Sequence, residues 1–116
     1  MRAYLRIILS AAGFDCHEAA DGAEGFDAVL KGNIDLVVTD LDMPVMDGFA
    51  LVSAISLLPA ARGRPPVIVV SGLLDETLAE RRPELRSATA LLAKPVQPAD
   101  LLKAVARAMG IRAPQG

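Results

Sequence analysis

The order of apolar and polar positions along the chain predicts helices that alternate with short strands. Apolar residues recur at helical spacing in some segments and alternate or run together in others. Predicted strands cover residues 14–18, 34–39, 67–70 and 90–93. Predicted helices cover 2–12, the segment from Asp21 to Gly32, the segment that Asp47 caps, a weak stretch over 75–85 interrupted near Pro83, and the segment from Pro98 to Gly110.

This alternation of strand and helix predicts an α/β protein with a doubly wound parallel sheet. The run Val67-Ile-Val-Val70 is entirely β-branched, as in strands that helices cover on both faces. Strands that alternate with helices in this way form open parallel sheets. Ligands of such sheets bind beyond the carboxyl ends of the strands. We therefore expect a functional site to lie where the predicted strands end.

Length and composition are those of one small domain over residues 1–116. The chain is 53% hydrophobic, with a net charge of −2 and a pI near 5.3, so it lacks the basic footprint of a nucleic-acid-binding protein. Cys16 is the lone cysteine, which excludes disulfide frameworks and cysteine zinc sites. No apolar run reaches the roughly 18 residues that a membrane span needs. We expect a soluble, cytoplasmic domain with no nucleic-acid or membrane partner.

Three predicted strands end on residues suited to phosphoryl chemistry: Asp40, Ser71 and Lys94. A carboxylate can attack phosphorus to give an aspartyl phosphate, a hydroxyl can bind a phosphoryl oxygen, and an ammonium can offset the charge on the transferred group. Taken singly, each residue is more often a turn or surface residue. The three together at one sheet edge favour a functional site.

The sequence resembles the receiver domain of two-component response regulators along essentially its whole length. The segment Asp35-Leu-Val-Val-Thr-Asp40-Leu-Asp-Met-Pro-Val-Met-Asp-Gly48 is similar to the family's phosphoacceptor strand and loop. The ends Val67-Ile-Val-Val-Ser71 and Leu92-Ala-Lys94-Pro95 resemble the strands that carry the family's Ser/Thr and Lys. The resemblance implies a flavodoxin-like, CheY-like fold that is not an enzyme beyond self-phosphorylation and autodephosphorylation.

The resemblance also implies a role for each residue of the site. Asp40 would be the phosphoacceptor, Ser71 the switch hydroxyl and Lys94 the cation that faces the phosphate. Asp40 and the backbone carbonyl of Asp42 would bind Mg²⁺, and the bond before Pro95 would be cis. The partners would be a histidine kinase or phosphotransfer protein and an output protein. No output domain follows in the sequence, so we expect signalling by protein contact through the face around the last strand and helix.

The sequence departs from the family pattern at its beginning. The family starts with a central strand that ends in an acidic metal-binding pair, and this chain starts with the helix that follows it. We therefore expect weak or absent Mg²⁺ binding. Three compensations are conceivable: pairing of 14–18 with 34–39, a strand donated by a partner or a second copy, or conversion of residues 4–9 to strand. The simplest expectation is that the given sequence is truncated and that the natural protein starts further upstream. Leu91 stands where the family has an aromatic switch residue, which predicts weaker coupling.

Two alternatives to a phosphorylated receiver follow from these departures. One is a degenerate receiver that binds partners without any phosphorylation cycle. The other, more remote, is a haloacid-dehalogenase-like phosphohydrolase, because Thr39-Asp-Leu-Asp42 also resembles the start of that family's motif. In that interpretation Asp42 would be the general acid/base.

Overall fold

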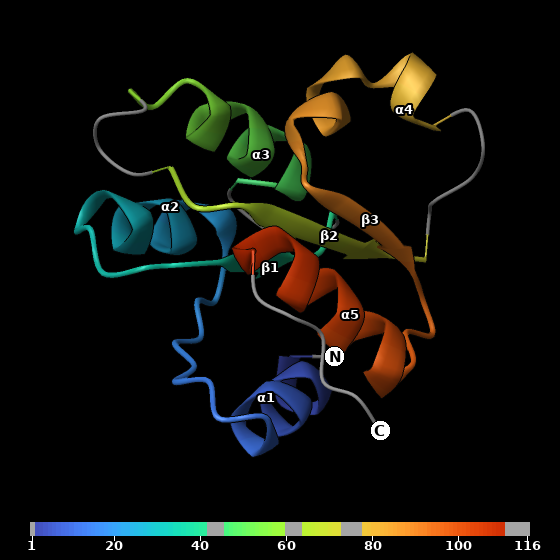
Figure 1. Cartoon of the computed structure of the whole chain (residues 1–116). Coiled ribbons are helices and arrows are strands. Elements are labelled where there is room, and N and C mark those ends of the chain that lie inside the picture. The colour runs from blue at the N-terminus through green and yellow to red at the C-terminus, as the bar shows by residue number, and fades with distance from the viewer. Residues whose placement is uncertain (1, 42–45, 60–63, 73–77, 111–116) are drawn as a thin grey trace.

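The computed structural model describes residues 2–41, 46–59, 64–72 and 78–110. Its helices and strands alternate along most of the chain, as the apolar pattern predicts (Figure 1). In chain order they are α1 (Arg2–Ala11), α2 (Gly22–Leu30), β1 (Val37–Thr39), α3 (Gly48–Ser56), β2 (Val67–Ser71), α4 (Leu78–Arg81), the 3-10 helix η2 (Pro83–Ser87), β3 (Ala90–Ala93) and α5 (Pro98–Met109).

The described strands form one parallel sheet in the order β1-β2-β3. All five residues of the central strand β2 are buried, because helices cover both of its faces. Val69 lies in the middle of the sheet, opposite Thr39 of β1 and Leu91 of β3. The predicted parallel α/β fold is confirmed, and the parallel arrangement brings all three carboxyl ends to one edge.

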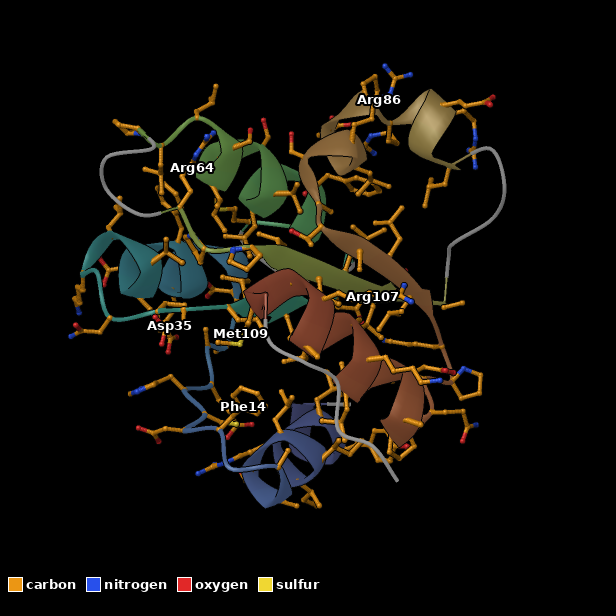
Figure 2. All side chains as sticks on the ribbon, viewed as in Figure 1. Phe14, Asp35, Arg64, Arg86, Arg107 and Met109 are labelled. Atoms are coloured by element: carbon orange, nitrogen blue, oxygen red, sulfur yellow. The ribbon has the colours of Figure 1, made fainter. Side chains whose placement is uncertain are left out.

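Two apolar clusters, one on each face of the sheet, form the core. On one face Val67 and Val69 pack with α2, α3, α4 and η2. On the other face Ile68 and Val70 pack with α5, and α1 lies against the same cluster. Figure 2 shows Phe14 between α1 and the end of α5, where Met109 lies. The period of two along β2 thus sends alternate side chains into opposite layers.

Helix boundaries follow the local signals in the sequence. The Asp21 side chain accepts a hydrogen bond from the backbone N–H of Glu24 at 2.9 Å, and Asp47 accepts one from Ala50 at 2.9 Å. Both predicted caps are therefore confirmed. Helix α5 ends at Gly110 in the left-handed conformation, with φ 69°. No helix among the described residues is both long enough and apolar enough to cross a membrane.

The weak helix predicted over 75–85 is two shorter elements in the structure. Helix α4 ends at Arg81, and η2 begins at Pro83. Proline has no backbone N–H to continue a helical hydrogen-bond ladder, which accounts for the break. Residues 75–77, where the predicted helix begins, lie outside the described residues.

The strand predicted over 14–18 is wrong, and the strand predicted over 34–39 is shorter, with β1 only at Val37–Thr39. Within the described residues no strand precedes β1, and the 14–18 segment pairs with no strand of the sheet. Instead Phe14 packs against the core, and Glu18 accepts a hydrogen bond from Arg6 of α1 at 2.8 Å. Alternation alone does not make a strand where a partner is lacking.

Two of the three expected compensations are therefore wrong. The 14–18 segment does not pair with β1, because it is not a strand. Residues 4–9 remain helical within α1. Helix α1 keeps its helical conformation because its apolar side chains Leu5, Ile8 and Leu9 already pack against the α5 layer. A strand donated by a partner stays a prediction.

Candidate functional site

The carboxyl edge of the sheet brings Asp40, Ser71 and Lys94 together. Asp40 follows β1, Ser71 is the last residue of β2, and Lys94 follows β3. The Nζ of Lys94 donates a hydrogen bond to the Oδ2 of Asp40. The backbone N–H of Lys94 donates to the backbone carbonyl of Ser71 at 3.0 Å. Parallel strands thus place residues that are 54 positions apart in direct contact.

The charged groups of this site reach solvent, whereas Ser71 is buried. The side chains of Asp40 and Lys94 are 25% and 27% exposed. Ser71 is 1% exposed, because it belongs to the fully covered strand β2. The Asp40 carboxylate is therefore accessible from solvent.

Backbone and hydroxyl groups around Asp40 fix the position of its carboxylate. Its Oδ1 accepts a hydrogen bond from the backbone N–H of Leu41 at 2.7 Å. The Oγ1 of the buried Thr39 donates to the backbone carbonyl of Asp40 at 2.9 Å. With Lys94 on the other oxygen, both carboxylate oxygens have a donor. Thr39 and Leu41 were not predicted as part of the site, although the position of Thr39 directly before Asp40 was the available signal.

Two glycines admit the backbone of the loop that follows Asp40. A Cβ on Gly48 would lie 2.1 Å from the backbone oxygen of Asp40, and the Gly48 N–H donates to the carbonyl of Leu41 at 3.0 Å. A Cβ on Gly22 would lie 2.1 Å from the backbone oxygen of Met46, which accepts from the Gly22 N–H at 3.1 Å. Only glycine permits such approaches. Each follows a capping aspartate, and this Asp-Gly pattern was the signal missed in the sequence.

Other predicted site residues have different outcomes. Asp42 lies outside the described residues, so its carbonyl as a metal ligand and its general acid/base role stay predictions. The peptide bond between Lys94 and Pro95 is cis.

Leu91 lies in β3 with 38% of its surface exposed, and it belongs to neither core cluster. Leu91 therefore does not pack as a core residue.

Among the described residues, the donors around Asp40 do not make up a tight Mg²⁺ site. Mg²⁺ takes oxygen ligands in a near-octahedral array, usually with more than one carboxylate or phosphate among them. Among the described residues no three carboxylate, histidine or cysteine side chains come together in a group that could hold a metal ion. The Asp40 carboxylate is already paired with the Lys94 ammonium, and a cation would have to compete with it.

Comparison with protein families identifies the chain directly. Residues 1–106 match the model of the response regulator receiver domain. The chain is 34% identical over 112 residues to the protein CcdB of Bacillus subtilis, which covers 95% of this chain and 89% of that protein. It is 39% identical over 66 residues to the gliding motility regulatory protein of Myxococcus xanthus, which covers 57% of this chain and 8% of that protein. The chain thus spans less than a tenth of several much longer relatives, sensor histidine kinases among them.

Solved structures agree with this match. The chemotaxis protein CheY4 of Vibrio cholerae has a TM-score of 0.77 and 30% identity, covering 92% of this chain and 88% of that one. The receiver domain of the sensor histidine kinase PA1611 from Pseudomonas aeruginosa has a TM-score of 0.78 at 22% identity, covering 94% and 88%. It is described with a magnesium ion coordinated in its active site cleft. Together with the sheet-edge site, these matches show that the chain belongs to the response regulator receiver domain family of two-component signalling.

Proposed function

We propose that Asp40 accepts a phosphoryl group from a histidine kinase or phosphotransfer protein. The observation that carries the proposal is the ion pair between Asp40 and Lys94 at the carboxyl edge of the sheet. A carboxylate oxygen of Asp40 would form a bond to phosphorus as the bond between phosphorus and the donor nitrogen breaks. The product is an acyl phosphate, and the donor imidazole keeps the electron pair of the broken bond.

The neighbouring residues would then stabilise the transferred group. Lys94 is close enough to shift from the carboxylate to a phosphoryl oxygen and offset its charge. The N–H of Leu41 already points at the Asp40 side chain and could donate to a developing negative charge there. Ser71 lies at the end of the next strand and would supply its hydroxyl.

A divalent ion would supply charge neutralisation at the phosphoryl group, as implied by the magnesium-containing receiver of PA1611. The single described carboxylate at the edge makes its affinity weak in this chain. We expect phosphorylation to be slow and to need high Mg²⁺ concentrations. The domain would work in the cytoplasm with a histidine kinase and pass its signal on by protein contact.

Phosphorylation of the purified protein tests the proposal. The protein is incubated with acetyl phosphate at several Mg²⁺ concentrations, and intact mass spectrometry follows the addition of a phosphoryl group. We expect one group on the wild-type protein and none on Asp40→Asn. The phosphate should be lost in acid and in base, as acyl phosphates are. An equal gain in Asp40→Asn contradicts the proposal.

A degenerate receiver is the second candidate, and the same ion pair favours it. The Lys94 ammonium neutralises Asp40 without a metal or phosphate, so the domain has a charge-balanced resting site. In this case partner binding should be unchanged in Asp40→Asn and Lys94→Ala, and no Mg²⁺ affinity should be detectable. Among the described residues nothing favours the phosphohydrolase, whose proposed acid/base residue Asp42 lies outside them.

A further inference from the structure

A groove of about 560 Å³ runs along the outer side of β3 and is bordered by α5. Every residue of β3 lines it, together with Asp100, Lys103, Ala104 and Arg107 of α5. Figure 2 shows Arg107 beside the sheet, on the side of α5 that faces β3. The groove therefore joins the edge of a strand to the polar flank of a helix.

The outer edge of β3 is an open strand edge. The backbone N–H of Lys94, directly after β3, donates to Ser71 of β2 at 3.0 Å. Every second residue of a strand directs its backbone groups to the same edge, so Ala90 and Leu92 also face β2, and the backbone groups of Leu91 and Ala93 point away from it. In the described part of the chain no strand pairs with β3 on that side. Such an edge is a template for an added strand.

The side chains along this edge differ between the two faces of the sheet. Leu91 points to the face opposite α5 and is 38% exposed, so it offers an apolar contact. On the α5 face, Lys103 and Arg107 are exposed and form no ion pair with any described residue. With Asp100 as the only acidic lining residue, the groove is basic, although the chain as a whole carries −2.

We propose that the edge of β3 binds an extended segment of a partner protein whose side chains alternate between apolar and acidic. The backbone of the segment would pair with Leu91 and Ala93, its apolar side chains would cover the Leu91 side chain, and its acidic ones would face Lys103 and Arg107. A second copy of this chain is a poorer occupant, because edge-to-edge pairing would bring the like charges of two grooves together. The inference rests on the proposed function, since it gives a chemistry to the partner that the signalling face would contact.

Titration of the unphosphorylated, isotope-labelled protein with a synthetic peptide tests this inference by NMR. The probe is a capped six-residue peptide of alternating valine and glutamate. We expect the largest amide shift changes in β3 and at the α5 flank of the groove. A peptide of alternating valine and lysine should bind at least roughly fivefold more weakly, because its charges oppose those of the groove. Methylation of alternate peptide nitrogens should abolish binding, since it removes the donors of a strand pair.

Protein variants separate this groove from general charge attraction. Lys103→Glu and Arg107→Glu should each weaken binding about threefold or more, as expected for a contact at a solvent-exposed rim. Lys31→Glu, directly after α2, changes the net charge equally and should leave binding unchanged, since Lys31 does not line the groove. Equal weakening by Lys31→Glu, undiminished binding of the methylated peptide, or no shift changes in β3 at millimolar peptide overturns the inference. The Asp40→Asn protein should bind the peptide normally, so failure here is distinguishable from failure of phosphorylation.

Discussion

The Nζ of Lys94 donates a hydrogen bond to the Oδ2 of Asp40 and so joins the end of β3 to the end of β1. The central strand β2 lies between these two strands, and the pair bridges it at the carboxyl edge. Ser71, the last residue of β2, accepts a backbone hydrogen bond from Lys94 at 3.0 Å. Lys94 therefore links the ends of all three strands.

Lys94→Met should slow phosphorylation of Asp40 while the fold persists. Loss of one preorganised charge stabiliser costs about 10²–10³ in rate at comparable sites. The side chain is partly exposed, so its loss should change thermal stability little. Phosphoprotein accumulation with acetyl phosphate gives the rate, and Lys31→Met, at the exposed residue directly after α2, is the control. A Lys94→Met rate equal to that of the control would show that the ammonium has no role.

Gly48→Ala should both destabilise the protein and slow phosphorylation. The new Cβ would lie 2.1 Å from the backbone oxygen of Asp40, so the backbone beside the phosphoacceptor must move. Overpacking of this kind costs about 1–3 kcal/mol in the free energy of unfolding. Urea denaturation measures the change.

Gly25→Ala is the matched control for that substitution. Gly25 lies within helix α2, and a Cβ there would meet only the side-chain atoms of Ala19 at 3.7 Å and Leu51 at 3.9 Å. Alanine in a helix interior is more favourable than glycine by roughly 0.5–1 kcal/mol, so this variant should be stabilised. A Gly48→Ala protein as stable as the wild type would contradict the close approach of Gly48 to Asp40.

Leu101→Ala should remove a large part of the stability of the α5 layer. Leu101 is fully buried between α5 and the sheet, in contact with the Ile68 and Val70 cluster. Truncation of a buried leucine costs about 2–5 kcal/mol. Leu57 is 81% exposed, and Leu57→Ala should stay within about 0.5 kcal/mol of the wild type. Equal losses in the two variants would contradict the placement of α5 against the sheet.

Glu84 should make a small pH-dependent contribution to stability. A hydrogen bond to its own backbone N–H, and next the Arg82 side chain at 3.2 Å, lower the pKa of this carboxyl below its usual value. A lowered pKa means that the ionised form is favoured in the folded state. The contribution is therefore present at neutral pH and is lost as the pH falls through the folded pKa. Unfolding curves of the wild type and Glu84→Gln should differ at pH 7 and converge in acid, and a constant difference would contradict this.

Local signals in the sequence predicted much of this fold, because local physics decides those elements. The capping aspartates Asp21 and Asp47 fixed the starts of two helices, and the β-branched run at 67–70 identified the buried central strand. The site trio followed from topology, since parallel strands must end at one edge. The error at 14–18 has a different origin, because a strand depends on a neighbour that its own residues do not encode.

The details around Asp40 were beyond prediction from pattern alone. Which donors reach its two oxygens depends on backbone geometry at Leu41 and on the length of the Lys94 side chain. The exposure of Leu91 follows from its position in β3, on the face opposite α5. Long-range packing decides both.

Borohydride trapping of the phosphorylated protein tests the central claim most directly. After incubation with acetyl phosphate and Mg²⁺, borohydride reduces an aspartyl phosphate to homoserine, and tandem mass spectrometry of the peptides locates the altered residue. The account predicts homoserine at position 40 in the wild type, a reduced amount in Lys94→Met and none in Asp40→Asn. Homoserine at another aspartate with Asp40 unaltered would contradict it.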